Sequence, residues 1–486
     1  MFVFNDCRTD SRVLREAGTL AAAGHHVTVM ARPSSPISTD GEREEKDGFV
    51  IVRVPIPQRY RLFSLWLRSP WRIGNWAIPR ARRGLRRLPA GLLDIGLAAA
   101  AVVASLPISL VRGPFHLAAR SRNQRAAARA AARTSVGDAE AEEATGELPG
   151  QARRRSPAVW LVRWRWVVTA WARAAASAAG PADAYHGHDL PGLVAAVAAA
   201  DRHSAARVVY DSHEIYLESG ANADQPGWLR RLMMDRERRL VGRAAALVTV
   251  NDSLADELGR RYSPARTVVV HNCPPRSDPP ADGTDLIRAA TGIAVGEPIA
   301  LYHGAFSRHR GLEQLAAAVA EPGLEQVNAV FLGYGGLRAR LDALAAGPVA
   351  PGRVHVLAAV PPEELGGWVA AADVGVMAIQ PSTINHRLST PNKLFECLAA
   401  GVPVVASDFP EMRRIVCDDP AGSLGIVVAP DDVPALARAI LAIVAAPPAD
   451  RAELRARCLR AAHERWNWET ESGRLLALYA DLAEAS

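Results

Sequence analysis

The sequence predicts an α/β protein with two Rossmann-like domains that face each other across a cleft. Short runs rich in Val and Ile alternate with helical stretches, and a Pro- and Asp-rich stretch, 274–283, interrupts this alternation once. Strands that are buried on both faces read as continuous apolar runs, and their alternation with helices predicts parallel, doubly wound sheets. A chain of 486 residues, 49% of them apolar, is also too long for one ordinary core.

The apolar runs define the order of the expected strands. In the first half they cover 1–4, 25–31, 48–56, 182–188, 206–212, 245–251 and 267–272. In the second half they cover 298–306, 327–335, 353–360, 373–379, 402–408 and 425–430. We therefore expect a first domain at 1–275, a linker at 276–297 and a second domain at 298–465. The last segment, 466–486, is expected to form a helix that packs back on the first domain.

Residues 57–181 fit neither half and are expected to be a helical, low-complexity insertion in the first domain. Arginines crowd this region together with seven of the eleven tryptophans. Trp, Leu and Arg in the same helices are typical of a surface that lies in the membrane interface, so we predict a monotopic patch on anionic lipid. The alternative is an ordinary insertion whose tryptophans pack on the core. No nucleic-acid motif accompanies the basic stretches.

An uncharged run within this insertion, 95–111, is at the lower edge of the length needed to span a bilayer. A single crossing would put strands of one sheet on opposite sides of the membrane, which excludes it. Five scattered cysteines without close pairs predict neither a disulfide framework nor a zinc site. With no basic-then-apolar leader, the expected location is cytoplasmic, peripheral at the inner face of the cell membrane.

Polar residues gather at the expected strand ends of the first half. The loop "NDCRTDSR" offers Asp10 or Ser11 as a helix cap, with Arg12 nearby. Two neighbouring strand ends, "YHGHDL" and "VYDSHEIY", carry His186, His188, Asp189, Asp211, His213 and Glu214. We predict no metal at the His-X-His pair, because the spacing fixes no third ligand. The cluster nevertheless lies where a ligand site is expected in open α/β sheets.

Two stretches of the second half predict an anion site. In "GAFSRHRGLEQL", Gly304 lets the backbone approach a ligand, and Arg308 and Arg310 bring positive charge to a helix start. A solvated basic loop would have the same sequence. In "STPNKLFECLAAGVPVVASD", Pro391 suits the first turn of a helix that Ser389 or Thr390 caps.

The residues that follow Pro391 add a cation and a carboxylate. Lys393, one of only two lysines in the chain, adds its charge to the free N–H groups of that turn. Glu396 is suited to accept hydrogen bonds from vicinal hydroxyls, as on a ribose. Phosphate donors and a hydroxyl acceptor together predict a bound nucleoside diphosphate.

The motifs "DSRVLREAGTLAAAGHHVTV", "HGHDLPGL", "VYDSHEIY", "LYHGAFSRHRGLEQL", "FLGYGG" and "PNKLFECLAAGVPVVASDFPE" resemble glycosyltransferase family 4, whose members are retaining enzymes of the GT-B fold. The resemblance spans both halves and spares 57–181. It implies that His213, Arg310 and Lys393 are catalytic, with His213 contacting the donor sugar and Arg310 gripping the diphosphate. The other implied donor-binding residues are Gly304, Arg308, Pro391, Asn392, Glu396, Gly333 and Gly335. Those expected on the acceptor side are Asp10, Arg12, His188 and Asp189.

One position departs from the family pattern. The family pairs two glutamates eight residues apart, and Leu388 stands where the first would precede Glu396. Backbone N–H groups from Thr390 to Lys393 and a neighbouring side chain take over its role, or donor use has been lost. We expect the first alternative, because the phosphate and ribose groups remain.

The predicted function is transfer of a sugar, with retention, from a nucleoside-diphosphate sugar to a glycan or a polyprenyl- or lipid-linked acceptor at the membrane. UDP is the favoured nucleotide, and no metal or other cofactor is expected. One alternative is a non-catalytic membrane scaffold, which Leu388 would explain. The other is a nucleotide-sugar epimerase on the same fold, which would need no membrane patch.

Overall fold

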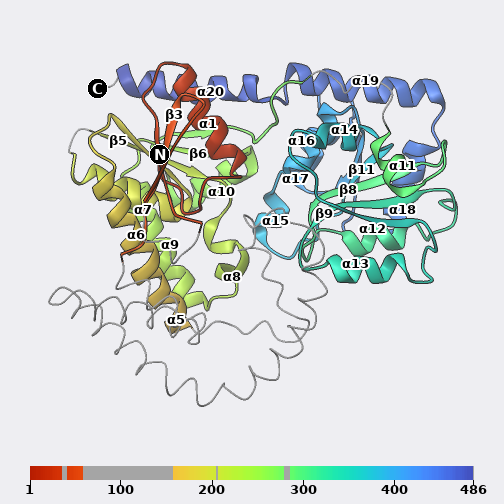
Figure 1. The fold of residues 1–486 in the computed structure, drawn as a ribbon, viewed down its shortest axis with the longest axis horizontal. Helices are drawn as coiled ribbons and strands as arrows, with labels where there is room; N and C mark the ends of the chain where they lie inside the picture. Colours follow the sequence, from red (N-terminus) through yellow and green to blue (C-terminus); the bar gives the residue numbers. More distant parts are fainter. Residues whose placement is uncertain (35–40, 58–156, 204–205, 278–284, 485–486) are drawn as a thin grey trace, which may run out of the picture.

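The computed structural model describes residues 1–34, 41–57, 157–203, 206–277 and 285–484. Figure 1 shows two α/β halves, with the helices α19 and α20 running along the same edge of the molecule. Each half has its own sheet with helices on its faces; the sheet of the second half is all-parallel, and that of the first half has one antiparallel edge strand. The α/β class and the two Rossmann-like domains are thus confirmed.

The first half contains one sheet with a break at Phe2. Its strands are β1 (Thr28–Ala31), β2 (Glu42–Lys46), β3 (Phe49–Arg53), β4 (Ala184–His188), β5 (Arg207–Ser212), β6 (Ala246–Thr249) and β7 (Thr267–Val269). The order is β2-β3-β1 on one side and β4-β5-β6-β7 on the other, and Phe2 bridges Met30 and Gly187 between them. The strand expected at 1–4 therefore exists only as isolated bridges, although the Phe2 N–H donates to the His186 carbonyl at 2.7 Å.

The edge strand β2 was not predicted. It runs antiparallel to β3, whereas the pattern predicted parallel strands only. Asp47 and Gly48 connect the two strands with φ angles of 46° and 81°, and positive φ at both positions is typical of a tight two-residue hairpin. Four of the five β2 residues are exposed and charged, which protects the edge from pairing with another chain.

Helices cover both faces of the first sheet. They are α1 (Ser11–Ala22), α5 (Pro157–Arg163), the π-helix η1 (Trp164–Val168), α6 (Thr169–Ala178), α7 (Asp189–Ala200), the 3-10 helix η2 (Tyr216–Glu218), α8 (Gly220–Ala223), α9 (Gly227–Val241) and α10 (Asp252–Tyr262). Because the loops before α1, α7 and α10 follow the carboxyl ends of extended segments, polar residues there gather at one edge of the sheet.

The second half is an all-parallel sheet in the order β10-β9-β8-β11-β12-β13. Its strands are β8 (Ile299–Ala305), β9 (Asn328–Tyr334), β10 (Val354–Ala358), β11 (Val374–Met377), β12 (Val404–Ser407) and β13 (Gly425–Val428). The direction of winding reverses between β8 and β11. In open α/β sheets, ligands bind outside the carboxyl ends of the strands at such a switch point. The loop after Ala305 and the connection after Met377 both leave from there.

The helices of the second half surround this sheet and extend back to the first. They are α11 (Leu286–Thr291), α12 (Leu312–Ala318), α13 (Arg338–Ala345), α14 (Leu365–Ala370), α15 (Ile384–Leu388), α16 (Asn392–Ala399), α17 (Pro410–Val416), α18 (Val433–Val444), α19 (Pro448–Glu464) and α20 (Trp468–Glu484). Helix α20 packs on the first half: Trp468 donates to Thr19 at 2.8 Å, and the buried Glu471 accepts from the His271 N–H at 2.9 Å. Leu475 and Leu478 complete a shared core there.

Three of the four tryptophans of α5, η1 and α6 are core residues, and the fourth, Trp166, is exposed. Trp160, Trp164 and Trp171 are 8%, 3% and 0% exposed and belong to the largest cluster of the first half. Trp160 and Trp164 stack with their centroids 5.6 Å apart. The prediction that they face a membrane is therefore wrong, and the last part of the expected insertion is integral to the domain. The rest of it, including 95–111, lies outside the described residues.

Within the described ranges, no single helix is both long and apolar enough to cross a bilayer. One pair of helices, Val433–Val444 followed by Pro448–Glu484, has sufficient length and apolar content only when taken together, and it bends by 101° at the break.

Replacement of Trp171 by alanine should destabilise the first half, because truncating a fully buried Trp costs about 3–5 kcal/mol. Trp228→Ala is the matched control: its side chain is 58% exposed, and such surface changes stay within about 0.5 kcal/mol. Urea unfolding followed by circular dichroism should show a lower midpoint for the first variant only. Equal midpoints would contradict the core position of Trp171.

Candidate active site

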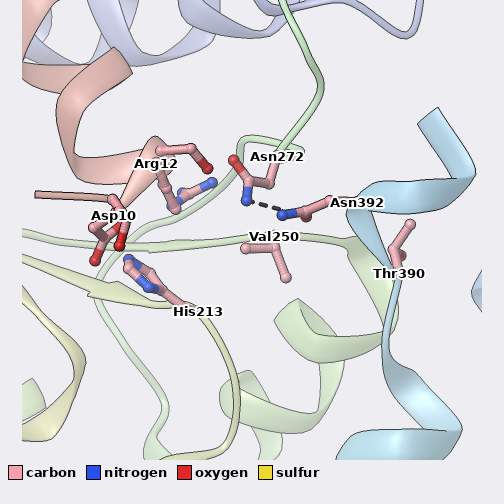
Figure 2. Close-up of a pocket in the computed structure, with 9 residues that line it drawn as sticks. Asp10, Arg12, His213, Val250, Asn272, Thr390 and Asn392 are labelled. Atoms are coloured by element: carbon pink, nitrogen blue, oxygen red, sulfur yellow. Dashed lines mark hydrogen bonds between the residues drawn. The ribbon is translucent and has the colours of Figure 1, made fainter. Parts of the chain in front are cut away.

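A cavity of about 270 Å³ lies between the two halves. Figure 2 shows that loops of the first half and the start of α16 contribute its walls. The lining residues are Thr9, Asp10, Ser11, Arg12, His213, Val250, Asn272, Thr390 and Asn392. Those of the first half follow the carboxyl ends of extended segments, where a ligand site was expected.

His213 faces this cavity from the end of β5, beside Asp10 (Figure 2). Its Nε2 lies 3.3 Å from Asp211 and 3.1 Å from His188 Nδ1, and its Nδ1 lies 3.8 Å from Asp189. Burial works against a charged ring, but the Asp189 and Asp211 carboxylates raise the pKa of His213 to about 10. The ring that faces the cavity is therefore a cation at neutral pH.

Asp211 is the centre of the polar cluster behind His213. It is fully buried and accepts from Arg12 Nε at 2.8 Å and Arg12 Nη2 at 3.0 Å. Although burial alone would raise it, the Arg12 and His213 charges hold the pKa of Asp211 well below its usual range. Burial lowers the pKa of His188 to about 3, with His186 adding to the effect. His188 is thus neutral, and the proton resides on His213.

Two residues expected on the acceptor side have other partners. His188 is 1% exposed and contacts Asp211 and His213, so it lies behind the cavity. Arg12 reaches the cavity wall, yet its guanidinium is 2% exposed and is bound by Asp211, Glu16 and the Val270 carbonyl. Both residues are therefore supports of the site, and the prediction that they contact the acceptor is corrected.

Asp10 lines the cavity, whereas Asp189 is not among the lining residues and contacts His213 instead. The predicted contact of both residues with the acceptor stays a prediction. Asp10 caps α1, as one of the two cap candidates, by accepting from the Val13 N–H at 3.2 Å. Asp189 begins α7 with a φ of 53°, and its carboxylate accepts from the His213 N–H at 3.2 Å. That strained turn brings the Asp189 carboxylate to His213.

Glu16, His186, His188 and Asp211 lie close enough together to resemble a metal site, with ligand atoms within 4.8 Å of one another. The Arg12 guanidinium already occupies this cluster, 3.1 Å from Glu16 and 2.8 Å from Asp211. Burial and the nearby Asp211 charge also raise the pKa of Glu16 well above its usual value, which favours the protonated acid. The cluster is therefore better suited to fixing His213 than to binding a cation.

The second half places two cations at its switch point. Lys393 Nζ lies 3.5 Å from the centroid of the Tyr302 ring, beside Gly304 at the end of β8. Burial and the positive charge of Arg310 lower the pKa of Lys393 to about 7, against the opposing effect of Glu396. Among the described residues, Arg308, Arg310 and Lys393 form no ion pair. Two neighbouring cations, of which only Lys393 is affected by a nearby carboxylate and neither forms an ion pair with a described residue, are an arrangement suited to an anion.

The loop that carries Arg310 is rigidly folded. His309 has a φ of 65°, and its carbonyl accepts from the Gln380 N–H at 2.8 Å. Gly311 follows with a φ of 79°, and a Cβ there would lie 2.2 Å from the Ala378 carbonyl oxygen. This close contact with the end of β11 fixes the half-buried Arg310, whereas Arg308 is exposed.

The start of α16 differs from its prediction by one position. Pro391 is the residue before the helix and not its first residue, and no side chain caps the first turn. Thr390 instead accepts from Asn251 at 3.0 Å, and Ser389 bonds to the His386 carbonyl. An uncapped helix start beside Lys393 adds N–H groups to the anion site.

Glu396 lies one turn further along α16. One of its oxygens is 2.8 Å from His303 Nε2, and its side chain remains 30% exposed. Burial opposes its charge, but the His303 hydrogen bond and the Lys393 charge lower the pKa of Glu396. An ionised, oriented carboxylate is the group expected to accept hydrogen bonds from ribose hydroxyls.

The backbone of β8 and of the residue that follows it leaves no room for a side chain at Gly333 or Gly335. A Cβ at Gly333 would lie 2.0 Å from the Gly304 carbonyl oxygen, and one at Gly335 would lie 2.6 Å from the Phe306 carbonyl oxygen. These glycines therefore have a packing role at the switch point, independent of any donor contact.

Leu388, at the position where the family resemblance predicts a glutamate, contacts the first half. Leu388 and Ile384 pack against its core, and Asn251 donates to the Leu388 carbonyl at 2.8 Å. Asn272 donates to Asn392 at 3.0 Å across the same interface. Asn251 and Asn272 were missed as site residues, although each is the last residue of an expected strand, 245–251 and 267–272. That position was the signal that could have identified them.

Comparisons with known proteins agree with this architecture. A model described as "Glycosyl transferases group 1" matches residues 297–446, and one described as "Glycosyl transferase 4-like domain" matches residues 116–273. No curated protein matches the sequence significantly.

Several solved structures share the fold. Sucrose-phosphate synthase from Thermosynechococcus elongatus has 19% identity and a TM-score of 0.62, with 98% of this chain and 93% of that chain covered. UDP-forming trehalose-phosphate synthase from Burkholderia xenovorans has 13% identity and a TM-score of 0.61, covering 99% and 98%. Anabaena HepE, in complex with UDP and glucose, has 19% identity and a TM-score of 0.50, covering 64% and 81%. The two matched segments and the two facing domains together show that the chain is a glycosyltransferase of the GT-B fold.

Proposed function

We propose that this glycosyltransferase is a retaining enzyme of family 4 that uses a UDP-sugar. Its acceptor is a glycan or a polyprenyl- or lipid-linked molecule presented at the cytoplasmic face of the membrane. The observation that carries the donor assignment is the pairing of Arg310 with Lys393 beside the uncapped start of α16. The repulsion between these cations is relieved when a diphosphate lies between them.

Two relatives of the fold favour UDP as the nucleotide. HepE was solved with UDP and with UDP-glucose, and the trehalose-phosphate synthase is named for forming UDP. In our proposal the Glu396 carboxylate binds the ribose, which leaves the base to backbone contacts. Thr390 and Asn392, which line the cavity beside Leu388, take over the sugar contacts of the missing glutamate.

In the proposed mechanism, positive charge at the leaving diphosphate contributes more to the rate than acid–base groups do. As the bond between the anomeric carbon and the diphosphate breaks, negative charge grows on the leaving oxygens. Arg310, Lys393 and the N–H groups of α16 stabilise this charge, and the exposed Arg308 contributes less. The acceptor hydroxyl attacks from the same face, and its proton passes to the departing phosphate. The scheme routes no step through a metal or other cofactor.

His213 has a separate role in this mechanism. As a cation held by Asp211 and Asp189, it donates a hydrogen bond from the cavity wall to the donor sugar. The ring cannot act as a general base while it holds its proton. This agrees with a reaction in which the phosphate itself takes the acceptor proton.

Arg310→Ala and Lys393→Ala should each lower the transfer rate about 10²- to 10³-fold, because each removes a preorganised charge at the leaving group. Arg438→Ala, a change at an exposed arginine of the same half, should leave the rate unchanged. The measurement is UDP release from a panel of UDP-sugars with native membranes as acceptor source. Full activity of Lys393→Ala would refute the proposed diphosphate site.

UDP binding above neutral pH should take up a proton. The free Lys393 has a pKa lowered to about 7, so it is mostly neutral at higher pH, and the bound diphosphate restores its charge. The affinity for UDP should therefore fall as pH rises above 7. Calorimetry in two buffers of different ionisation enthalpy measures the uptake. Lys393→Arg, which stays charged, should bind with a flat pH profile; the same uptake in that variant would exclude Lys393 as its source.

Glu396→Gln should weaken UDP binding about 10- to 100-fold, because hydrogen bonds to a charged group are worth about 1.5–3 kcal/mol. The wild type should lose a similar factor when the ribose hydroxyls are removed from UDP. In the variant, the same deoxygenation should have little further effect. Additive losses in calorimetric titrations would mean that Glu396 does not contact the ribose.

A further inference from the structure

We propose that helix α9 and the adjacent η1–α6 segment form a surface that binds an anionic membrane. We call it the α9 surface and define it by Trp228, Arg231, Leu232, Arg236 and Arg239 of α9, with Arg165, Trp166 and Arg173 of η1–α6. This proposal deepens the proposed function, because it names the membrane contact that presents the acceptor. The proposal rests on that function for the identity of the acceptor, but the binding of the surface to a membrane does not.

Apolar side chains are exposed on the α9 surface. Trp228 is 58%, Leu232 48% and Trp166 40% exposed. They are three of the six large hydrophobic residues that are exposed within the described ranges, and the other three belong to the second half. Single exposed apolar residues need no explanation, but two tryptophans and a leucine on neighbouring elements are typical of a binding surface.

Helical spacing puts the α9 residues on one face. Arg231, Leu232 and Arg239 follow Trp228 by three, four and eleven residues, so the four residues form a single exposed stripe. The opposite face, with Leu229, Met233, Glu237 and Val241, is buried against the first half. The exposed stripe therefore has apolar and basic residues together. The one acidic residue on it, Asp235, pairs with Arg238, and its carbonyl accepts from Arg239.

The arginines of the α9 surface lie close to one another. Burial and the positive charges of Arg165, Arg173 and Arg239 lower the pKa of Arg236, which shows that α9 and η1–α6 bring their charges together. Within the described part of the chain, none of the five arginines of this surface forms an ion pair. By contrast, their neighbours Arg230 and Arg238 pair with Glu218 and Asp235. This charge is available to an anionic partner.

A lipid surface fits this combination better than a nucleic acid or an acidic protein. Tryptophan rings and a leucine enter the boundary between headgroups and acyl chains, while the guanidinium groups remain among the phosphates. The arginines alone would suit several partners, but the exposed Leu232 between them has no role on a phosphate backbone. In Figure 1, α6 and α9 lie on the side of the first half away from α20. α9 follows shortly after His213, so the surface belongs to the domain that holds the acceptor side of the cavity.

The test is co-sedimentation of the full chain with vesicles of phosphatidylcholine alone or mixed in equal parts with phosphatidylglycerol. We expect binding to the mixed vesicles only, weakened by salt. Arg231→Gln with Arg239→Gln should lower the partition coefficient about 25-fold, from about fivefold for each arginine. Trp228→Ser with Leu232→Ser should lower it about tenfold or more. UDP binding should be unchanged in both variants, which separates a failure of this surface from a failure of the donor site.

Matched controls come from the second half. Arg438→Gln removes an exposed arginine there, and Val295→Ser with Val349→Ser removes exposed apolar side chains; neither should change vesicle binding. Equal binding of the α9 variants and the wild type would overturn the proposal. So would an absence of binding to the mixed vesicles.

Discussion

The placement of the Lys393 ammonium at a largely buried helix start, over the Tyr302 ring and near Arg310, is the constraint that defines the proposed anion site of the second half. A fold normally separates like charges or gives each a carboxylate, and here a rigid loop and a helix start bring them together. A side chain at Gly311 would clash with the Ala378 carbonyl, so replacing this glycine would move the loop. The Lys393 ammonium lies over the face of the Tyr302 ring, which stabilises a cation. In the proposed function, a bound diphosphate offsets both the burial of the Lys393 charge and its repulsion from Arg310, so that binding favours the charged ammonium.

In the first half, one buried carboxylate determines which of the neighbouring groups carry a charge. Asp211 is fully buried, yet it is stabilised by Arg12, and it then fixes the proton on His213 at the cavity wall. His188 stays neutral because burial and the adjacent His186 disfavour a second charge. Charge in both halves is therefore set by burial and neighbours. The His213 cation lines the cavity, whereas Arg310 and Lys393 lie at the switch point of the second sheet and are not among the lining residues.

The sheets and the second-half site could be predicted because both depend on local patterns. Apolar runs mark buried strands, and Lys393 and Glu396 lie on one short helix whose start is visible in the sequence. The antiparallel β2 was missed because its exposed, charged residues have no apolar signal, although Asp47–Gly48 is a hairpin turn. Trp160, Trp164 and Trp171 were assigned to a membrane because composition cannot distinguish a buried face from an exposed one. We expected Arg12 and His188 to contact the acceptor because the sequence does not reveal their contacts with Asp211. Asp211 is distant in sequence from Arg12.

Leu388 shows how a lost carboxylate can be compatible with catalysis. At this position the chain turns toward the first half, where Leu388 and Ile384 pack against its core and Asn251 binds the Leu388 carbonyl. A glutamate there would bury a charge against apolar residues unless it found a partner. Under the proposed function, a leucine here gives up a charged contact to the sugar in favour of contact between the domains. The neutral hydrogen bonds proposed for Thr390 and Asn392 are weaker than those of a carboxylate, so the proposed binding of the donor relies more on its diphosphate.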